Sequence, residues 1–314
     1  MKKILIVGAG GQIGSELVTY LRGLYGNGNV VAADLRQSER LAADGPFEIL
    51  DALDAERYAE LVRKYGIDSI FNLAAMLSAK GEANPTLAWK INIGSLTNSL
   101  EVARQYNCAL FTPSSIGAFG GDFPRDNTPQ DTIMQPNTMY GVCKVTGELL
   151  SNYYHTRFGV DTRSVRFPGI ISNVTLPGGG TTDYAVEIYY AAVKGERFVC
   201  PVSSNVYMDM MYMPDALRAT VELMEADPAK LKHRNSFNIA SMSFTPEIIY
   251  AEIRKRLPEF EMVYDVDPVK EAIAESWPNK LDDTCAREEW GWKPQWDLSS
   301  MTDDMLRAVR AKNI

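Results

Sequence analysis

The N-terminal stretch Ile4-Leu-Ile-Val-Gly8-Ala-Gly-Gly-Gln-Ile-Gly14 decides the fold of this chain. Its first four residues are aliphatic and mostly β-branched, which predicts a short strand buried on both faces of a sheet. A glycine-rich turn follows at once, and residues 15–25 then carry apolar side chains at helical spacing. A buried strand, a glycine turn and a helix are typical of the opening unit of a parallel α/β sheet.

The same alternation of strand and helix continues through the first half of the chain. Further strands are predicted at 30–34, 47–50, 69–74, 109–112 and 162–167, and further helices at 55–65, 85–106 and 139–158. Strands that alternate with helices predict parallel pairing, with helices on both faces of the sheet. We therefore expect an α/β fold built on a Rossmann-type, doubly wound parallel sheet.

Gly8, Gly11 and Gly14 occupy the turn between the first strand and the first helix. Glycines there allow a tight turn, close approach of a pyrophosphate and close helix packing, and the helix N-terminus favours the anion. Asp34 lies 20 residues after Gly14, where a carboxylate can bind the adenosine ribose and repel a 2′-phosphate. The motif predicts NAD rather than NADP, although Arg36 is close by and Asp34 could instead cap a turn.

After Pro168 the alternation breaks down. Helices are predicted at 184–193 and 215–224 and after Thr245 and Ser299, and strands at 198–202, 206–213, 236–240 and 262–266. We expect residues 1–172 to form the dinucleotide-binding domain, with 206–240 returning to it. Residues 173–205 and 241–314 would form a smaller α/β substrate-binding part.

Composition narrows the classes of function. The 314 residues carry a net charge of −8, with no basic run and no apolar stretch of about 20 residues, so neither nucleic acid nor a membrane is an expected partner. The short apolar run after Met-Lys-Lys leads into the glycine turn and does not read as a signal peptide. Four widely spaced cysteines predict reduced thiols in a cytoplasmic protein. The two histidines lie far apart, so no metal site is expected.

Tyr140 and Lys144 fall four residues apart in the predicted helix 139–158. That spacing places both side chains on one helical face. A neighbouring ammonium favours the phenolate, so such a pair can transfer a proton to or from a substrate oxygen. A Tyr-x-x-x-Lys match taken alone is usually exposed helix surface, and its weight depends on the nucleotide-binding pattern around it.

Taken together, these motifs resemble the extended short-chain dehydrogenase/reductase family. The resemblance rests on Gly8, Gly11, Gly14 and Asp34, on Asn72-Leu-Ala-Ala75, and on Ser115 placed 25 residues before Tyr140 and Lys144. Within that family, three segments resemble the NAD-dependent L-threonine 3-dehydrogenases, which are related to UDP-galactose 4-epimerase. They are Arg166-Phe-Pro-Gly-Ile-Ile-Ser172, Pro177-Gly-Gly-Gly-Thr-Thr-Asp-Tyr-Ala185, and Ser276-Trp-Pro together with Trp290-Gly-Trp-Lys-Pro294.

The resemblance implies roles for matching residues. Tyr140 would be the general base on the threonine hydroxyl, Lys144 would hold the nicotinamide ribose, and Ser115 would bind the reacting oxygen. Asn92 matches the family's helix asparagine, and Asp51 could reach the adenine or merely cap its turn. The implied cofactor-binding set is Gly8, Gly11, Gln12, Ile13, Gly14, Asp34, Leu35, Arg36, Asp51, Leu53, Leu73, Ala74, Ala75, Asn92, Tyr140, Lys144, Phe167, Pro168 and Ile170.

A small zwitterionic substrate needs hydrogen bonds to a carboxylate, an ammonium and a hydroxyl. Polar or aromatic residues after the fourth strand and beyond the glycine loop at 178–180 could supply these hydrogen bonds. Loop residues of these types also act as hinges or pack against other segments. Asp183 could accept the ammonium, but a cap at the helix that starts at Tyr184 is the simpler interpretation. The implied substrate-binding set is Ser78, Ser115, Tyr140, Gly179, Thr181, Thr182 and Trp277.

The resemblance further implies a homodimer formed through helices 85–106 and 139–158. Leu87, Ile91, Val102, Val145 and Leu149 would supply apolar surface, although burial within one chain explains them equally well. Two rival functions remain open at this stage. One is a sugar-nucleotide epimerase or dehydratase, disfavoured because 178–210 offers only Lys194 and Arg197 to a second pyrophosphate. The other is a non-catalytic NAD sensor on the same fold.

Overall fold

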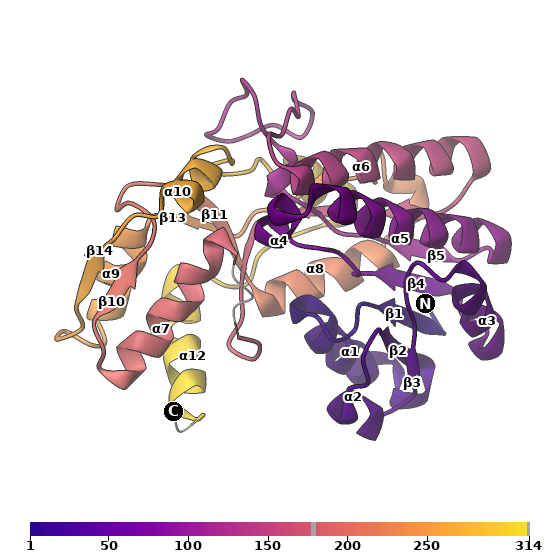
Figure 1. The fold of residues 1–314 in the computed structure, drawn as a ribbon, viewed down its shortest axis with the longest axis horizontal. Helices are drawn as coiled ribbons and strands as arrows, with labels where there is room; N and C mark the ends of the chain where they lie inside the picture. The colour runs from indigo at the N-terminus through magenta and orange to yellow at the C-terminus, as the bar shows by residue number, and fades with distance from the viewer. Residues whose placement is uncertain (177–179, 313–314) are drawn as a thin grey trace. The chain divides into compact units, whose positions relative to one another are not determined.

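The computed structural model describes residues 1–176 and 180–312, and they form two compact units (Figure 1). The first unit comprises Met1–Ala118, Pro136–Arg166 and Leu217–Phe237. The second comprises Phe119–Gln135, Phe167–Ala216 and Asn238–Ile314. Across the described residues, no helix has the length and apolar character that a membrane crossing requires.

The first unit is built on a parallel sheet with strand order β3-β2-β1-β4-β5-β7, which confirms the predicted Rossmann-type fold. Its strands are β1 (Ile4–Val7), β2 (Val30–Asp34), β3 (Phe47–Ile49), β4 (Ser69–Asn72), β5 (Ala109–Phe111) and β7 (Thr162–Arg163). Val7 lies opposite both Ala33 and Asn72. The glycine turn, Asp34 and the segment after Asn72 therefore emerge at one edge of the sheet, where ligands of open α/β sheets bind.

Helices cover this sheet, and three of them have the predicted bounds. They are α3 (Ala55–Tyr65), α5 (Pro85–Tyr106) and α6 (Met139–Phe158), and α5 and α6 lie side by side (Figure 1). Asp54 and Thr138 cap the N-termini of α3 and α6 with their side chains. A buried apolar core of Leu5, Val31, Ile70, Leu100 and Leu110 packs beneath them. The remaining helices here are α1 (Gln12–Tyr25), α2 (Glu39–Ala43), α4 (Ser78–Ala83) and α8 (Met213–Glu225), which runs on from the second unit.

The predicted strand 162–167 divides in two. Only Thr162–Arg163 joins the main sheet, because the backbone N–H of Ser164 donates to the carbonyl of Arg234 instead. The remainder, β8 (Val165–Phe167), lies between β6 (Ser114–Ser115) and β12 (Phe237–Asn238) in a short sheet of its own. This division places Ser114 and Ser115 in a strand beside Arg166.

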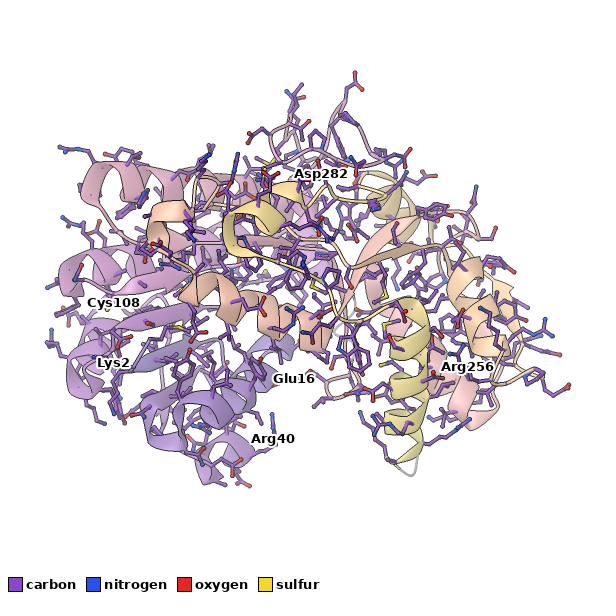
Figure 2. All side chains as sticks on the ribbon, turned by 180° about the vertical axis from the view of Figure 1, so that it is seen from behind. Lys2, Glu16, Arg40, Cys108, Arg256 and Asp282 are labelled. Carbon is purple, nitrogen blue, oxygen red and sulfur yellow. The ribbon has the colours of Figure 1, made fainter. Side chains whose placement is uncertain are left out.

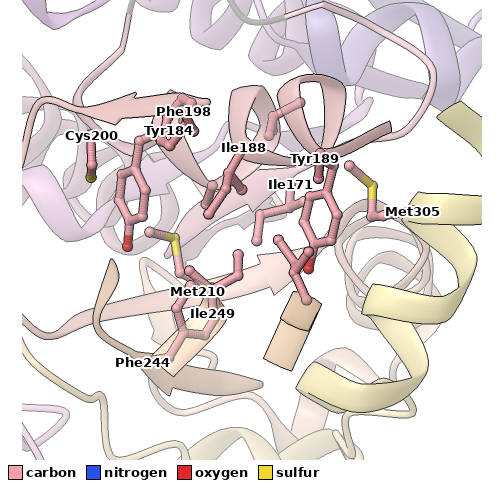
Figure 3. Packing of buried hydrophobic residues seen from close by; sticks show 14 of the residues in the cluster. Ile171, Tyr184, Ile188, Tyr189, Phe198, Cys200, Met210, Phe244, Ile249 and Met305 are labelled. Carbon is pink, nitrogen blue, oxygen red and sulfur yellow. The ribbon is translucent and has the colours of Figure 1, made fainter. Parts of the chain in front are cut away.

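The second unit contains two small sheets. Strand β11 (Met208–Tyr212) runs parallel to β9 (Gly169–Ile171) and antiparallel to β13 (Met242–Phe244), and β10 (Phe198–Cys200) pairs with β14 (Met262–Tyr264). Its helices are α7 (Tyr184–Lys194), α9 (Pro246–Arg254), α10 (Pro268–Glu275), α11 (Thr284–Trp290) and α12 (Leu298–Arg310). Figure 3 shows Tyr184, Ile188 and Tyr189 packed in one apolar cluster with Met210, Phe244, Ile249 and Met305. Arg256, labelled in Figure 2, lies just after α9. It forms an ion pair with Asp303 of α12 at 2.8 Å.

The boundaries of the compact units differ from the predicted domain boundaries. Residues 119–135, 167–172, 206–216 and 238–240 belong to the second unit, although we expected 1–172 and 206–240 to form one domain. Hydrogen bonds explain the shift of 119–135: the Thr128 N–H donates to Lys280, and Asn238 donates to the Thr128 carbonyl. These partners lie more than 100 residues away along the chain, so local sequence patterns cannot predict the hydrogen bonds. The assignment of cofactor binding to one part and substrate binding to the other stays a prediction.

Candidate active site

The glycine turn after β1 is shaped by close backbone contacts. Gly8 has a φ of +82°, and a Cβ built there would lie 2.7 Å from the Ala74 nitrogen. A Cβ on Gly14 would lie 2.2 Å from the Gly8 carbonyl oxygen. Any side chain at either position would fill the space or push the segments apart. The turn therefore keeps backbone exposed beside Leu73, Ala74 and Ala75, as a pyrophosphate cradle requires.

The N-terminus of α1 is free to bind an anion. Its cap is Gly11, which offers no side-chain hydrogen bond, and the first turn, where Gln12 and Ile13 lie, has no acidic residue. The unpaired backbone N–H groups and the helix dipole of such an end favour a phosphate. The Asp34 carboxylate accepts a hydrogen bond of 2.8 Å from the Gly10 N–H, so it is held at the tip of the turn. Gly10 was not among the residues predicted from the sequence.

The residues expected around the adenosine have separate environments. Leu35 is 64% exposed, and Arg36 beside it is also exposed. Asp51 accepts a hydrogen bond of 2.9 Å from the Leu53 N–H, so its carboxylate caps its own turn. Leu53 packs against α5, because its Cδ2 lies 2.7 Å from where a Gly94 Cβ would be. Contact of these four residues with adenosine stays a prediction.

Tyr140 and Lys144 lie against the segment that follows β5. A Cβ on Gly117 would lie 3.2 Å from two carbons of the Tyr140 ring. Ser115 Oγ accepts the Gly117 N–H at 3.1 Å. Lys144 Nζ lies 5.3 Å from the centre of the Tyr140 ring and donates to the Pro113 carbonyl at 2.6 Å. The fold thus brings Ser115, Tyr140 and Lys144 together.

Two glycines make this approach possible, and the sequence analysis did not single them out. A Cβ on Gly141 would lie only 2.2 Å from the Gly117 carbonyl oxygen. The first turn of α6 therefore docks onto the 3₁₀ turn Ile116–Ala118 by direct backbone contact. Gly141 directly follows Tyr140 and Gly117 lies two residues after Ser115, but only the tertiary contact requires glycine at these positions.

Next to the predicted catalytic pair lies a buried group that the sequence analysis also missed. Glu148 Oε1 accepts Ser114 Oγ at 2.5 Å and Arg166 Nε at 3.0 Å, and Oε2 accepts Arg166 Nη2 at 2.8 Å. The side chains of Glu148 and Arg166 are 3% and 5% exposed. The four-residue step from Lys144 to Glu148 was the available signal, because it continues the helical face that carries Tyr140.

The loop after β4 is fixed by α5. Asn92 Oδ1 accepts the Met76 N–H at 2.7 Å, and its Nδ2 donates to the Met76 carbonyl at 3.1 Å. Its amide thus holds the loop that follows the expected cofactor residues Leu73, Ala74 and Ala75, which is a structural role. A cavity of about 40 Å³ lies alongside, lined by Leu73, Ala74, Ala75, Asn92 and Lys144, with the buried Oδ1 of Asn72 unpaired among the described groups.

Ser78 begins α4, a short helix that the sequence analysis did not predict. Glu82 of this helix accepts the backbone N–H of Met139 at 2.6 Å. A carboxylate at a helix N-terminus satisfies an otherwise unpaired donor and complements the helix dipole. The bond ties the helix of Ser78 to the turn of α6 that carries Tyr140.

The remaining predicted residues lie in the second unit. Thr181 and Thr182 form a 3₁₀ turn with Asp183, and a Cβ on Gly169 would lie 2.7 Å from Thr182 Cγ2. Asp183 accepts the Gly180 N–H at 2.6 Å and so closes this turn, whereas it makes no side-chain cap on α7. The turn packs against α10, and Trp277, 8% exposed, follows that helix. Phe167, Pro168 and Ile170 lie at and after the end of β8, and Gly179 falls outside the described residues.

The buried cysteines are poorly suited to act as nucleophiles. All four cysteines are free, and Cys143 is buried on α6 beside Lys144. Burial raises the pKa of the Cys143 thiol, and it raises the pKa of Cys108 and Cys200 to about 11. Thiols that stay protonated are poor nucleophiles, so the buried cysteines are weak candidates for a reactive group.

A nucleotide cradle combined with a Ser-Tyr-Lys group on a parallel α/β sheet defines an NAD-dependent protein of the extended dehydrogenase class. Residues 4–240 match the model of the NAD dependent epimerase/dehydratase family. The chain belongs to this family, and its cofactor is NAD.

Several relatives match over nearly the whole length of the chain. An uncharacterised epimerase/dehydratase of Staphylococcus aureus strain MRSA252 is 56% identical, over 100% of this chain and 98% of the relative. The X-ray structure of L-threonine dehydrogenase from Clostridium difficile matches with a TM-score of 0.98 and 55% identity, covering 100% of this chain and 99% of the other. A monomeric L-threonine 3-dehydrogenase from a metagenome matches with a TM-score of 0.95 and 43% identity, covering 99% and 100%.

Proposed function

We propose that this protein oxidises L-threonine at its hydroxyl-bearing carbon, passes hydride to NAD and forms 2-amino-3-oxobutanoate, as a step of threonine breakdown in the cytoplasm. The observation that carries the proposal is the packing of Tyr140 and Lys144 against the segment that bears Ser115. The similarity to two L-threonine dehydrogenases over nearly the full chain supports the choice of substrate.

Each residue of this group has a distinct task in the proposed reaction. When bound, NAD supplies the acceptor for the hydride. Ser115 donates a hydrogen bond to the substrate oxygen, and Tyr140 accepts the hydroxyl proton. Lys144 has three N–H bonds and donates one to Pro113, which leaves two for ribose hydroxyls. The backbone contacts at Gly117 and Gly141 hold the tyrosine in place before substrate arrives.

The substrate's charged ends need neutral hydrogen-bond partners. On the resemblance in sequence, we propose Ser78, Thr181 and Thr182 as these partners and Trp277 as an apolar wall. Thr182 is fixed by its contact with Gly169, and the Thr181 turn is closed by Asp183. Gly179 is proposed as a further substrate contact on the basis of its sequence segment.

An absorbance assay for NADH tests the proposed function. Purified protein is given NAD or NADP with L-threonine, L-serine, longer hydroxy amino acids and UDP-sugars. We expect NADH to accumulate with threonine and NAD, and Tyr140→Phe to lower the rate by roughly 100-fold or more, because acid–base catalysis is worth that much. Tyr153→Phe, at an exposed tyrosine on the same helix, is the matched control.

Three other outcomes would contradict the proposal. An epimerase recycles its NAD, so conversion of a UDP-sugar without net NADH would establish the epimerase alternative. A protein that binds NAD but turns over no member of the panel would be a sensor. An unchanged rate with Tyr140→Phe would show that the tyrosine is not the base.

We also propose that two copies of the chain associate through α5 and α6. Leu87 and Leu149 on these helices are 45% and 64% exposed, and Val142 and Phe158 add further exposed apolar surface. Val102 does not belong to this surface, because it is buried in the core of the first unit at 4% exposure. Burial of such side chains against a second copy would remove apolar area from water.

Light scattering on purified protein decides the oligomeric state. We expect twice the 34.9 kDa mass of one chain, and a shift towards monomer in Leu149→Lys. Leu24→Lys, at a leucine of α1 that is 55% exposed, is the control and should leave the mass unchanged. A wild type of single-chain mass would contradict the dimer and match the metagenomic neighbour described as monomeric.

A further inference from the structure

One face of helix α6 contacts the segment Pro113-Ser114-Ser115. Tyr140, Lys144 and Glu148 follow at four-residue steps along that face. Lys144 donates to the Pro113 carbonyl, Glu148 accepts the Ser114 hydroxyl, and Tyr140 contacts the glycine that bonds Ser115. Three successive residues of the strand segment are therefore fixed from one helix.

The contact with Ser114 is anchored by a buried ion pair. Arg166 on β8 bonds both oxygens of Glu148, at 3.0 and 2.8 Å, and each side chain is at most 5% exposed. Removing two charges from water is costly, and a buried pair of this kind often contributes little net stability. What it does provide is a fixed geometry, because the two parallel N–H···O bonds hold the carboxylate in one orientation.

We propose that Glu148 is a positioning residue for the reaction, acting through Ser114 on both Ser115 and Lys144. The inference rests on the proposed function, in which those two residues hold the substrate oxygen and the ribose. Ser114 lies between the carbonyl that fixes Lys144 and the hydroxyl of Ser115. Its 2.5 Å bond to Glu148 is the link that ties this strand segment to the ion pair.

The consequence of losing the link follows from its position. Without the Ser114 bond, the Pro113 carbonyl and Ser115 Oγ lose one of the contacts that fix them relative to Tyr140, although no group that touches substrate has been removed. Misplacement by about 1 Å can slow an enzymatic step by roughly 100-fold. The larger change should appear in the chemical step. Lys144 and Ser115 keep their side chains, and in the described part of the chain the glycine turn and Asp34, which would hold the rest of NAD, form no hydrogen bond with Ser114 or Glu148.

Ser114→Ala is the decisive variant, because it removes the link and leaves the Glu148–Arg166 pair in place. We expect kcat to fall roughly 10- to 100-fold while KM for NAD and for the amino acid stays within about two-fold. The isotope effect on kcat, measured with substrate deuterated at the hydroxyl-bearing carbon, should rise as hydride transfer becomes slower. Ser114→Thr, which keeps a hydroxyl, should recover most of kcat.

Two matched variants separate positioning from stability. Ser99→Ala removes a buried serine hydroxyl of α5, bonded to Tyr58, in the same unit, and Asp161→Asn breaks ion pairs to the buried Arg163 and Arg234. Both should lower the melting temperature but leave kcat and the isotope effect unchanged. Glu148→Gln should resemble Ser114→Ala if it folds; if it does not fold, Ser114→Ala alone decides.

The outcomes distinguish this inference from the proposed function. A wild type active on threonine whose Ser114→Ala variant keeps its kcat would overturn the positioning role and leave the function intact. An equal loss of kcat in Ser99→Ala would also overturn it, since any buried serine would then matter. Activity on a UDP-sugar instead of threonine would overturn the proposed substrate. The positioning role would then be judged by the same loss of kcat in Ser114→Ala on the UDP-sugar reaction. A wild type without any turnover would overturn both.

Discussion

The Nζ of Lys144 donates a 2.6 Å hydrogen bond to the carbonyl oxygen of Pro113, two residues before Ser115. The lysine thus holds the segment that follows β5 as well as facing the tyrosine. Lys144→Met should lower kcat/KM for NAD reduction by roughly 100-fold or more, because both the ribose contact and the proton-transfer geometry are lost. Steady-state kinetics measure this, with Lys90→Met on the exposed side of α5 as the control. Activity retained within ten-fold would argue against a catalytic Lys144.

Gly117 provides a steric test of the Tyr140 position. In Gly117→Ala the new Cβ would lie 3.2 Å from the tyrosine ring and 3.5 Å from Ser115 Oγ, so the ring must shift. We expect kcat to fall about 10-fold or more with little change in NAD affinity measured by titration. Gly23→Ala in α1 meets no atom within 4 Å and should stabilise the fold by about 0.5–1 kcal/mol without affecting the rate. Equal rates in the two variants would refute the packing argument.

Asp34 should set the preference for NAD over NADP. Its carboxylate is held by the Gly10 N–H at the tip of the glycine turn, where it would repel a 2′-phosphate. Asp34→Ser should lower the ratio of kcat/KM for NAD to that for NADP by at least ~10-fold, since one lost charge–charge contact is worth about 1.4 kcal/mol or more. Asp44→Ser, after α2, is the control. An unaltered ratio would place the selectivity elsewhere, with Arg36 the next residue to change.

Asp209 should make stability depend on pH. It is buried on β11, one oxygen accepts the Leu281 N–H at 2.8 Å, and burial raises its pKa to about 8. An unfolded aspartate titrates near 4, so between about pH 4 and 8 the folded state binds the extra proton. Stability contributed by that proton is therefore fully present below about pH 4 and is lost as the pH rises from there to about 8.

Asp209→Asn keeps an acceptor for Leu281 but cannot ionise. The melting temperature of this variant relative to wild type should therefore rise between pH 6 and pH 9. Asp122→Asn, at an exposed position, should show no such trend. A difference in melting temperature that stays constant across this range would mean that Asp209 does not titrate there.

Several features of the site could be read from the sequence because they are local. The strand, glycine turn and helix at 4–25 and the four-residue step from Tyr140 to Lys144 each depend on neighbours within about one or two helical turns. The bounds of α3, α5 and α6 could be predicted for the same reason, since caps and apolar spacing lie within the segments. The choice of NAD followed from Asp34 at the end of a strand next to the turn.

Other features depend on contacts between distant segments. The Ser114–Glu148 bond spans 34 residues and the Arg125–Trp277 bond 152, and neither has a periodic signature. The short helix α4 was missed because its six residues include a glycine and carry no apolar repeat. The departure of β8 from the main sheet was missed because Ser164 finds its partner at Arg234, far along the chain.

The sequence by itself determined the class of fold, the nucleotide turn and the identity of the Tyr140–Lys144 pair, because backbone preference and side-chain periodicity act over short distances. Only the tertiary structure decided what surrounds that pair: the two glycines that let α6 approach, and the buried Glu148–Arg166 ion pair that holds Ser114. Both features arise from packing and desolvation between segments that are distant in sequence and that the fold brings together. The pair is thus a property of one helix, and its precise placement is a property of the whole first unit.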